Sequence, residues 1–412
     1  MLVTRSVHRP IVARNHLLRR HAVLSGIGIL SATLGLGREA LVLVSLGASQ
    51  ANDALQATLT VTYLVSMLGD AGRTTVLASL GHTTPTVIVR RTGFVIVGIA
   101  TLIAVTSALF LPQAKGPFIL AGTVGGMLNI AVAMAIAFWQ AINRPIQAQI
   151  LATLSNIVIF LIVGIATWLH LLTPELVVTA TVVAPLVQLV IFLSVATKQR
   201  PDRIKTANAA SSSSIYPARI FLHSAVGVGG AQLGQLAARA AVAGSAVGAL
   251  SVFAAVVRLF DSLRSVLLEP FVASRIARWK SEPVTLPALF HPSMIVITTT
   301  TATLVSAILN LLLPPISVAS LATQYGVLVG IGTILVFITR VVVVAMTANT
   351  PESAPFLKLS IVDCMIGTVL MAVPKGESAI VVLSCFFLLR PLLMTVVLWR
   401  SVAFRGITFQ HQ

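Results

Sequence analysis

Residues 31–54 read SATLGLGREALVLVSLGASQANDA, an apolar stretch of membrane-spanning character that the charged pair Arg38-Glu39 interrupts. A charged side chain in the hydrocarbon core costs about 2.5–3.5 kcal/mol on insertion scales, so such residues usually face a protein interior or a water-filled cavity. Successive residues on a helix point about 100° apart, so Arg38 and Glu39 are not expected to neutralise one another. Each should therefore have a partner elsewhere in the protein.

The residues around this pair suggest how it is accommodated. Gly35 and Gly37 weaken the helix locally and leave room for a neighbour or a ligand to approach the backbone. The apolar run ends at Asn52-Asp53, which is typical of the cap of a following helix. The stretch thus predicts a buried charged site inside a membrane-spanning helix, with a second helix starting directly after it.

The composition of the chain identifies its class. Hydrophobic residues make up 57% of the 412 residues, charged residues only 9%, and the mean hydropathy is +0.97. A soluble domain carries about 25% charged residues. The two cysteines, Cys364 and Cys385, form no metal-binding or redox spacing, and nucleotide-binding and metalloprotease motifs do not occur. We therefore expect an all-α polytopic membrane protein that is not an enzyme and needs no cofactor.

Apolar runs of about 20 residues, the length that crosses a bilayer, recur along the chain. They predict twelve spans, near residues 22–47, 54–80, 92–111, 118–141, 149–170, 175–197, 217–244, 247–272, 289–313, 316–340, 356–374 and 378–400. Spans with interior glycine and polar residues are expected to bend.

The segments between these runs predict the domain organisation. Residues 198–216 are charged and then serine-rich, which is typical of a flexible cytoplasmic linker. The chain then divides into a basic amino terminus at 1–21, six-helix bundles at 22–197 and 217–400, and a tail at 401–412. The amino terminus has five arginines and no acid, which indicates a cytoplasmic anchor, with an organellar transit peptide as the alternative.

The basic residues predict the orientation. With the amino terminus inside, the inner segments hold 19 of the 28 Lys and Arg residues and the outer loops hold two, Lys115 and Lys375. Such an asymmetry is the positive-inside signal and predicts that both termini are cytoplasmic. The net charge of +17 is then explained by orientation and by contact with anionic lipids, and it gives little support to nucleic-acid binding.

The two predicted bundles resemble each other. A shift of 199 residues aligns Ser25, Gly28, Ala32, Leu34 and Gly35 with Ser224, Gly227, Ala231, Leu233 and Gly234. Because each half contains an even number of spans, both halves enter the membrane from the same side. The pattern predicts a parallel repeat about an axis along the membrane normal, with a binding site between the halves.

Two stretches carry a resemblance to a known family. GLGREALVLVSLGASQANDAL at 35–55 resembles the first-span signature of the MurJ/MviN lipid flippases, and GALSVFAAVVRLFDSLRSVLLEPFVASRIARW at 248–279 resembles their eighth span. The family belongs to the multidrug/oligosaccharidyl-lipid/polysaccharide (MOP) flippase superfamily. The resemblance is good over about 25–80 and 240–280 and rests on hydropathy elsewhere.

The resemblance implies two six-helix bundles around a V-shaped cavity lined by spans 1, 2, 7 and 8, in a bacterial cytoplasmic membrane. In the family, basic cavity residues engage the anionic head group of a lipid-linked saccharide. Arg38 matches the first-span arginine of the family, Glu39 the acid beside it, Asp53 the acid that opens span 2, and Arg258 the eighth-span arginine. Envelope glycosyltransferases or polymerases are the implied protein partners.

The chain also departs from the family pattern. It has Ala32 where the family usually has another span-1 arginine, and Ser66 and Met67 where basic residues stand along span 2. It stops after twelve predicted spans, whereas MurJ-like proteins commonly carry two further helices. These departures concern the identity of the saccharide lipid more than the fold.

The residue chemistry points the same way. A diphosphate is costly to desolvate unless it is paired, and arginine stays charged and presents a fork that matches phosphate oxygens. Arg38 and Arg258 could meet a ligand from two sides, with Arg239 of span 7 as a third cation. The candidate substrate-binding residues are Arg38, Glu39, Asp53, Arg239, Arg258 and Asp261.

Structural explanations of the same residues stay open. Arg38 could form an interhelical ion pair, and Arg258 and Asp261, at i and i+3, could satisfy each other. Asn156 and Gln188 are expected to join helices. Two other functions also remain: a multidrug/cation antiporter of the same superfamily, which would need carboxylates deep in the cavity, and a transport-inactive flippase-like scaffold. Basic residues outnumber acids within the spans, which favours an anionic cargo.

Overall fold

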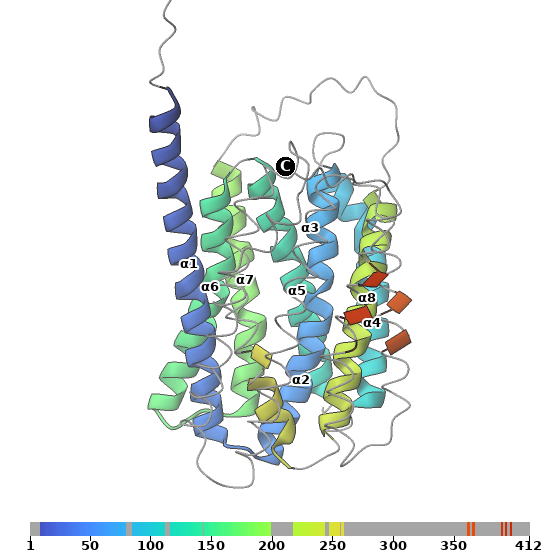
Figure 1. Ribbon diagram of the computed structural model, residues 1–412. Helices are drawn as coiled ribbons and strands as arrows, with labels where there is room; N and C mark the ends of the chain where they lie inside the picture. Colours follow the sequence, from blue (N-terminus) through green and yellow to red (C-terminus); the bar gives the residue numbers. More distant parts are fainter. Residues whose placement is uncertain are drawn as a thin grey trace, which may run out of the picture.

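The computed structural model describes residues 9–79, 85–111, 116–142, 144–198, 217–243, 247–255 and 257–258, with a few more residues between 361 and 397. The regular elements of this part are helices, most of them running side by side in a bundle (Figure 1). They are α1 Arg9–Leu46, α2 Gln50–Ser66, α3 Leu68–Ser79, α4 Pro85–Phe110, α5 Gly116–Ala141, α6 Pro145–Trp168, α7 Pro174–Lys198 and α8 Pro217–Ala243. A further helical segment follows Gly248 and reaches Arg258.

Proline marks the start of four of these helices, α4, α6, α7 and α8. Its fixed φ suits the first turn, where the missing N–H would have had no partner inside the helix. Within the described residues, five helices are long and apolar enough to cross a membrane: Gly26–Leu46, Val87–Leu109, Gly116–Gln140, Pro145–Trp168 and Pro174–Val195. The chain is thus an all-α, multi-pass membrane protein, as predicted.

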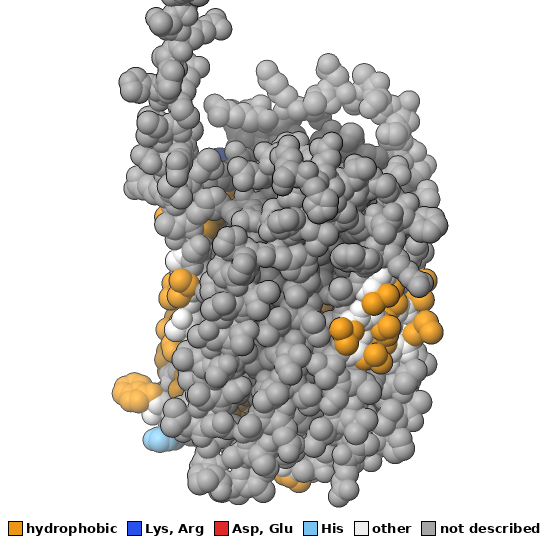
Figure 2. Space-filling model, viewed as in Figure 1, with side chains coloured by type: hydrophobic (Ala, Val, Ile, Leu, Met, Phe, Trp, Pro, Cys, Tyr) orange, Lys and Arg blue, Asp and Glu red, His pale blue; other side chains and the backbone are white. Residues whose placement is uncertain are grey.

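The outer surface of the bundle fits a lipid environment. The described side chains visible on one face are predominantly hydrophobic (Figure 2). Large apolar side chains such as Phe94 of α4, at 88% exposure, and Val190 of α7, at 62%, point away from the protein. Lipid tails offer these side chains an apolar solvent, so their exposure is not a defect of packing.

The helices of the first half overlap the predicted spans, but α1 begins at Arg9 and not near residue 22, and α4 begins at Pro85 and not near residue 92. The run predicted at 54–80 is divided at Met67 into α2 and α3, which is the bend expected of a span rich in polar residues. The cap of α2 is Ser49, whose Oγ accepts a hydrogen bond from the Asn52 N–H at 3.2 Å, so the predicted cap at Asn52-Asp53 is wrong by one turn. Serine suits this position because its short side chain reaches the free N–H groups of the first turn.

Several predictions fall outside the described residues. They are the spans after Arg258, and with them the count of twelve and the repeat of two six-helix bundles, most of the linker at 198–216, and Asp261.

Helix α5 lies at the centre of the first half, packed against α2, α3 and α7. Its glycines allow this: a Cβ on Gly126 would lie 2.5 Å from the Val65 Cβ, and one on Gly122 would lie 3.0 Å from the Thr58 carbonyl oxygen. The Gly-x-x-x-Gly spacing places both glycines on one face of α5, where they let the two backbones approach.

Helix α1 packs mainly on α6, and α8 packs on α3 and α4 (Figure 1). Gly37 of α1 faces the Phe160 ring and Gly35 faces the Asn156 amide, so the two glycines admit neighbouring side chains while α1 continues unbroken from Arg9 to Leu46.

The segment after α8 returns to the turn between α1 and α2. Gly248 has a φ of +83°, and a Cβ there would lie 2.7 Å from the Ala48 Cβ and 2.8 Å from the Ala48 carbonyl oxygen. Only glycine takes this conformation readily and fits this space. The contact brings the first turn of the helical segment that contains Arg258 against the end of α1, and so positions Arg258 near Arg38.

Candidate substrate-binding site

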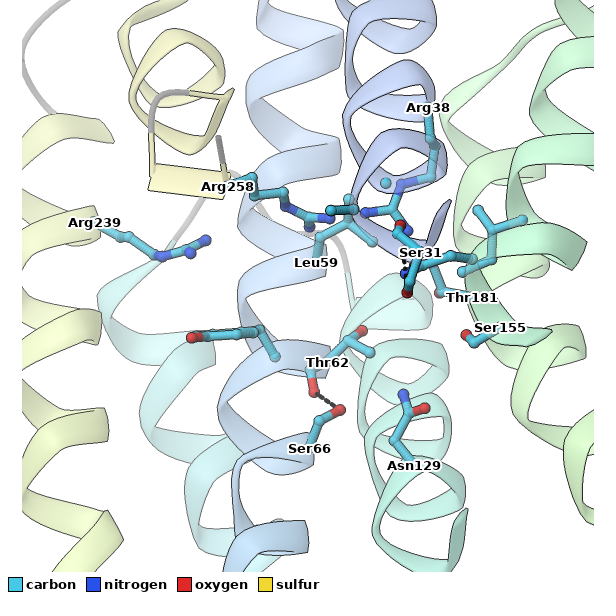
Figure 3. A pocket seen from close by; sticks show the side chains of 15 residues that line it. Ser31, Arg38, Leu59, Thr62, Ser66, Asn129, Ser155, Thr181, Arg239 and Arg258 are labelled. Atoms are coloured by element: carbon cyan, nitrogen blue, oxygen red, sulfur yellow. Dashed lines mark hydrogen bonds between the residues drawn. The ribbon is translucent and has the colours of Figure 1, made fainter. Parts of the chain in front are cut away.

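A cavity of about 390 Å³ lies between the two halves of the described structure. Its walls come from α1, α2, α5, α6, α7, α8 and the helical segment that contains Arg258 (Figure 3). It is lined by Ser31, Ala32, Gly35, Arg38, Leu59, Thr62, Tyr63, Ser66, Asn129, Ser155, Asn156, Ile159, Thr181, Arg239 and Arg258. Three of the six predicted site residues, Arg38, Arg239 and Arg258, therefore line one cavity, from both halves of the chain.

Arg38 and Glu39 form an ion pair, contrary to the expectation that neighbours on a helix could not neutralise each other. The Arg38 Nη2 lies 2.7 Å from the Glu39 Oε1 and the Arg38 Nε donates to the same oxygen at 3.1 Å. The long, flexible arginine side chain curves around the helix to span the angle between the two positions. Burial gives this pairing its advantage, because separated charges are costly where water is scarce.

The same oxygen of Glu39 binds the second arginine. Arg258 Nη1 donates to Glu39 Oε1 at 2.6 Å, which joins the first half of the chain to the second. The Glu39 carboxylate is 9% exposed and is not itself a lining residue, so it lies behind the two guanidinium groups. Glu39 holds the two cations together and leaves part of each facing the cavity.

Arg239 approaches the cavity from α8, separately from this cluster (Figure 3). Its Nη1 donates to the Thr60 Oγ1 at 2.8 Å, and its guanidinium carbon lies 5.4 Å from the centre of the Tyr63 ring. Both partners belong to α2, so α2 positions this arginine by a hydrogen bond and a cation–π contact. The side chain is almost fully buried, at 2% exposure of the residue.

Asp53, the fifth predicted site residue in the described part, does not line the cavity. Its Oδ2 accepts from the Gly248 N–H at 2.7 Å, and its Oδ1 accepts from the Ser251 N–H at 3.0 Å and the Ser251 Oγ at 2.7 Å. The carboxylate thus caps the helix that follows Gly248, where the free N–H groups favour an anion. In this structure its role is to join the two halves.

Uncharged polar side chains complete the lining, and most of them were missed as site candidates. Asn129 lies on α5, Ser155 on α6 and Thr181 on α7, each inside an otherwise apolar run. That interruption was the only available signal. Asn156, expected to join helices, does so: its Nδ2 donates to the Ser31 Oγ at 2.8 Å. Gln188 likewise bonds the Leu151 carbonyl.

The charges of the site are unequal in number. The described lining residues carry three guanidinium groups and no carboxylate, so with the single Glu39 carboxylate counted the net charge is +2. No group of three or more potential metal ligands occurs among the described residues. The site can attract and orient an anion that is rich in oxygen atoms.

Comparison of sequences alone does not classify the chain, since no protein-family model and no curated protein matches it. Solved structures do match. The lipid II flippase MurJ in an inward closed conformation aligns with a TM-score of 0.62 at 15% identity, covering 93% of this chain and 87% of that one. An inward-facing multidrug resistance MATE family transporter of the MOP superfamily gives 0.58 at 13% identity, covering 95% and 100%.

A third match is a MOP superfamily transporter from Pyrococcus furiosus, whose binding pocket is described as reversed in polarity, suggesting a different function. It aligns with a TM-score of 0.51 at 11% identity and covers 94% of this chain and 96% of that one. The resemblance to MurJ-like proteins expected from residues 35–55 and 248–279 is thereby confirmed at the level of architecture. The chain has the fold shared by the MurJ flippase and the MATE transporters of the MOP superfamily.

Proposed function

We propose that the protein is a flippase that moves a lipid-linked saccharide, of the polyprenyl-diphosphate type, across a bacterial cytoplasmic membrane for envelope biogenesis. The observation that carries the proposal is the set of three arginines, Arg38, Arg239 and Arg258, that line one cavity between the halves of the chain. Flipping requires no covalent step. It requires a sheltered site in which the charge of a diphosphate is matched.

The depth of the site supports this cargo. Arg38 lies 12 residues beyond Gly26, where the apolar part of α1 begins, so it lies about 18 Å along the span at 1.5 Å per residue. A hydrocarbon core is about 30 Å thick, so this charge is far from both membrane surfaces. Arginine forks bind phosphate oxygens in pairs, and the excess of +2 suits the charge of a diphosphate.

The mechanism that we infer is alternating access, in which the two halves rock about the central cavity. The contacts between the halves include two groups that involve α1 and the start of α2: the Glu39–Arg258 pair at the cavity, and the Asp53 cap with the Gly248–Ala48 contact at the far end of α1. Both groups have to rearrange when the cavity opens toward that end. Anionic lipids at the basic inner surface, and envelope glycosyltransferases or polymerases, are the partners that this function implies.

The alternative from the same fold is a multidrug/cation antiporter. It shares the architecture of the MATE transporters. A cation would need a carboxylate in the cavity, and the one carboxylate near it in the described residues, Glu39, is already held by two arginines. An inactive scaffold would keep the fold without the transport.

Replacement of Arg38 tests the proposal in reconstituted vesicles. We expect Arg38→Ala to lower flipping of a polyprenyl-diphosphate saccharide by more than about tenfold, since a charge-assisted hydrogen bond is worth about 1.5–3 kcal/mol. Arg38→Lys should recover part of the rate, because lysine keeps the charge but loses the paired fork.

The control is Arg90→Ala, which removes an exposed arginine at the start of α4, and all rates are normalised to folded protein. A well-folded Arg38→Ala protein that flips at the parental rate would remove Arg38 from the site. Export of an organic cation by the parental protein, with no flipping of the saccharide lipid, would support the antiporter.

A further inference from the structure

The cavity has two chemically different sides. Arg239 and Arg258 lie on one side, whereas the Asn129 amide and the Ser155 hydroxyl lie on the opposite side, on α5 and α6 (Figure 3). Asn129 is the fourteenth of 26 residues in α5 and Ser155 the eleventh of 24 in α6, so both lie near the middle of the membrane. Polar side chains at this depth are costly unless they are satisfied.

Most amides and hydroxyls in this part of the protein are satisfied by the protein itself. Asn156 bonds to Ser31, Gln188 bonds to the Leu151 carbonyl, and threonines such as Thr123 bond to the carbonyl four residues earlier in their own helix. Within the described residues, the side chains of Asn129 and Ser155 form no hydrogen bond. Both face the cavity, so their partners must come from its contents.

From this contrast we propose that Asn129 and Ser155 form an uncharged subsite that binds the hydroxyl-rich sugar part of the cargo and determines which saccharide is carried. The inference rests on the proposed function. One side of the cavity then binds the sugar of the cargo, and the other side binds its diphosphate. An amide offers two donors and an acceptor and a hydroxyl offers one donor, which suits sugar hydroxyls and does not discriminate by charge. The arginines then hold the diphosphate.

Binding measurements with two ligands test the subsite on the full-length protein in detergent. One ligand is a polyprenyl-diphosphate disaccharide and the other is the same polyprenyl diphosphate without sugar. We expect Asn129→Leu and Ser155→Ala each to weaken binding of the sugar-bearing ligand by about threefold to tenfold, the effect of one neutral hydrogen bond, and to leave the sugar-free ligand unchanged. Ser194→Ala is the matched control, because Ser194 lies on the exposed face of α7 and bonds the Val190 carbonyl.

The outcomes separate the subsite from the proposed function. Suppose that the parental protein binds both ligands. If the Asn129 and Ser155 variants then lose affinity for both ligands equally, or lose none, the subsite is overturned and the proposed flippase function still stands. Failure of the parental protein to bind either ligand would overturn the proposed function itself. If a variant unfolds, Asn129→Ser or Ser155→Thr takes its place, because each keeps a polar group but shifts its position. These variants should change the ratio of the binding affinities for saccharides of different structure.

Discussion

At the scale of single residues, Glu39 is the position on which the site depends most. One carboxylate oxygen accepts from two arginines on different halves of the chain, at 2.7 Å from Arg38 and 2.6 Å from Arg258. Without that carboxylate the two guanidinium groups would face each other in a poorly solvated place. Removal of one partner of a buried ion pair typically costs about 3–5 kcal/mol, because the remaining charge is left uncompensated.

We therefore expect Glu39→Gln to lower the thermal unfolding temperature of the protein in detergent, and to lower it less when Arg258→Gln is present as well. The double-mutant cycle measures this coupling. Arg73→Gln serves as the control for loss of an arginine elsewhere, since Arg73 donates to Gln140 and not to Glu39. Effects of Glu39→Gln and Arg258→Gln that simply add would show that the pair contributes no coupling energy.

Among the helices, α5 can pack closely on α2 because α5 has glycine, which has no side chain, at the contact. Gly126 leaves no room for a methyl group, because its Cβ would lie 2.5 Å from the Val65 Cβ and 3.0 Å from the Thr62 carbonyl oxygen. Since α2 carries Thr60 and Tyr63, which hold Arg239, a displacement of α2 would also disturb the cavity. Overpacking of a well-packed contact typically costs about 1–3 kcal/mol.

Gly126→Ala should accordingly destabilise the protein and reduce transport, measured as a lower unfolding temperature and a lower flipping rate. Gly98→Ala on α4 is the matched control, because a Cβ there meets no atom within 4 Å. In a helix alanine is favoured over glycine by about 1 kcal/mol, so this control should be neutral or slightly stabilising. If Gly126→Ala and Gly98→Ala had the same unfolding temperature and the same flipping rate, α2 and α5 could move apart without loss of stability.

At the scale of the whole molecule, the two halves are joined at the end of α1 by the Asp53 cap. Its carboxylate accepts three hydrogen bonds from Gly248 and Ser251, which belong to the second half of the chain. This contact lies at the opposite end of α1 from the amino terminus, and the same end of the bundle is closed by Gly248 against Ala48. Opening of the cavity toward that side therefore requires the cap to break.

Asp53→Asn should weaken the cap, because the amide presents one acceptor and a donor group where the carboxylate presents two acceptors. A cysteine placed at Thr181 in the cavity, in a chain whose two native cysteines are replaced, should then react faster with a membrane-impermeant thiol reagent added on that side. Asp70→Asn, at the start of α3, is the control. Unchanged reactivity in the Asp53 variant would show that the cap does not limit opening.

Features that depend on local patterns could be predicted from the amino-acid sequence. Hydropathy and span length predicted a polytopic helical membrane protein, and the apolar runs of the first half coincide with its helices, although α1 and α4 begin earlier than the runs do. Those properties can be predicted because a membrane span must satisfy its own backbone hydrogen bonds. Arg38, Arg239 and Arg258 could also be selected as candidates, since an arginine within a membrane span usually faces a protein interior or a water-filled cavity.

The pairing of these residues could not be predicted in the same way, because it depends on contacts between distant parts of the chain. Arg239 meets Thr60 across 179 positions of the chain, Asp53 meets Gly248 across 195, and Glu39 meets Arg258 across 219. The rotation and depth of each helix determine such contacts, and in a bilayer those depend on close packing between small residues such as Gly122 and Gly126, with little hydrophobic force to guide them. The same packing left Asn129 and Ser155 facing the cavity without a partner among the described residues, while Asn156, also an amide, was bonded to α1.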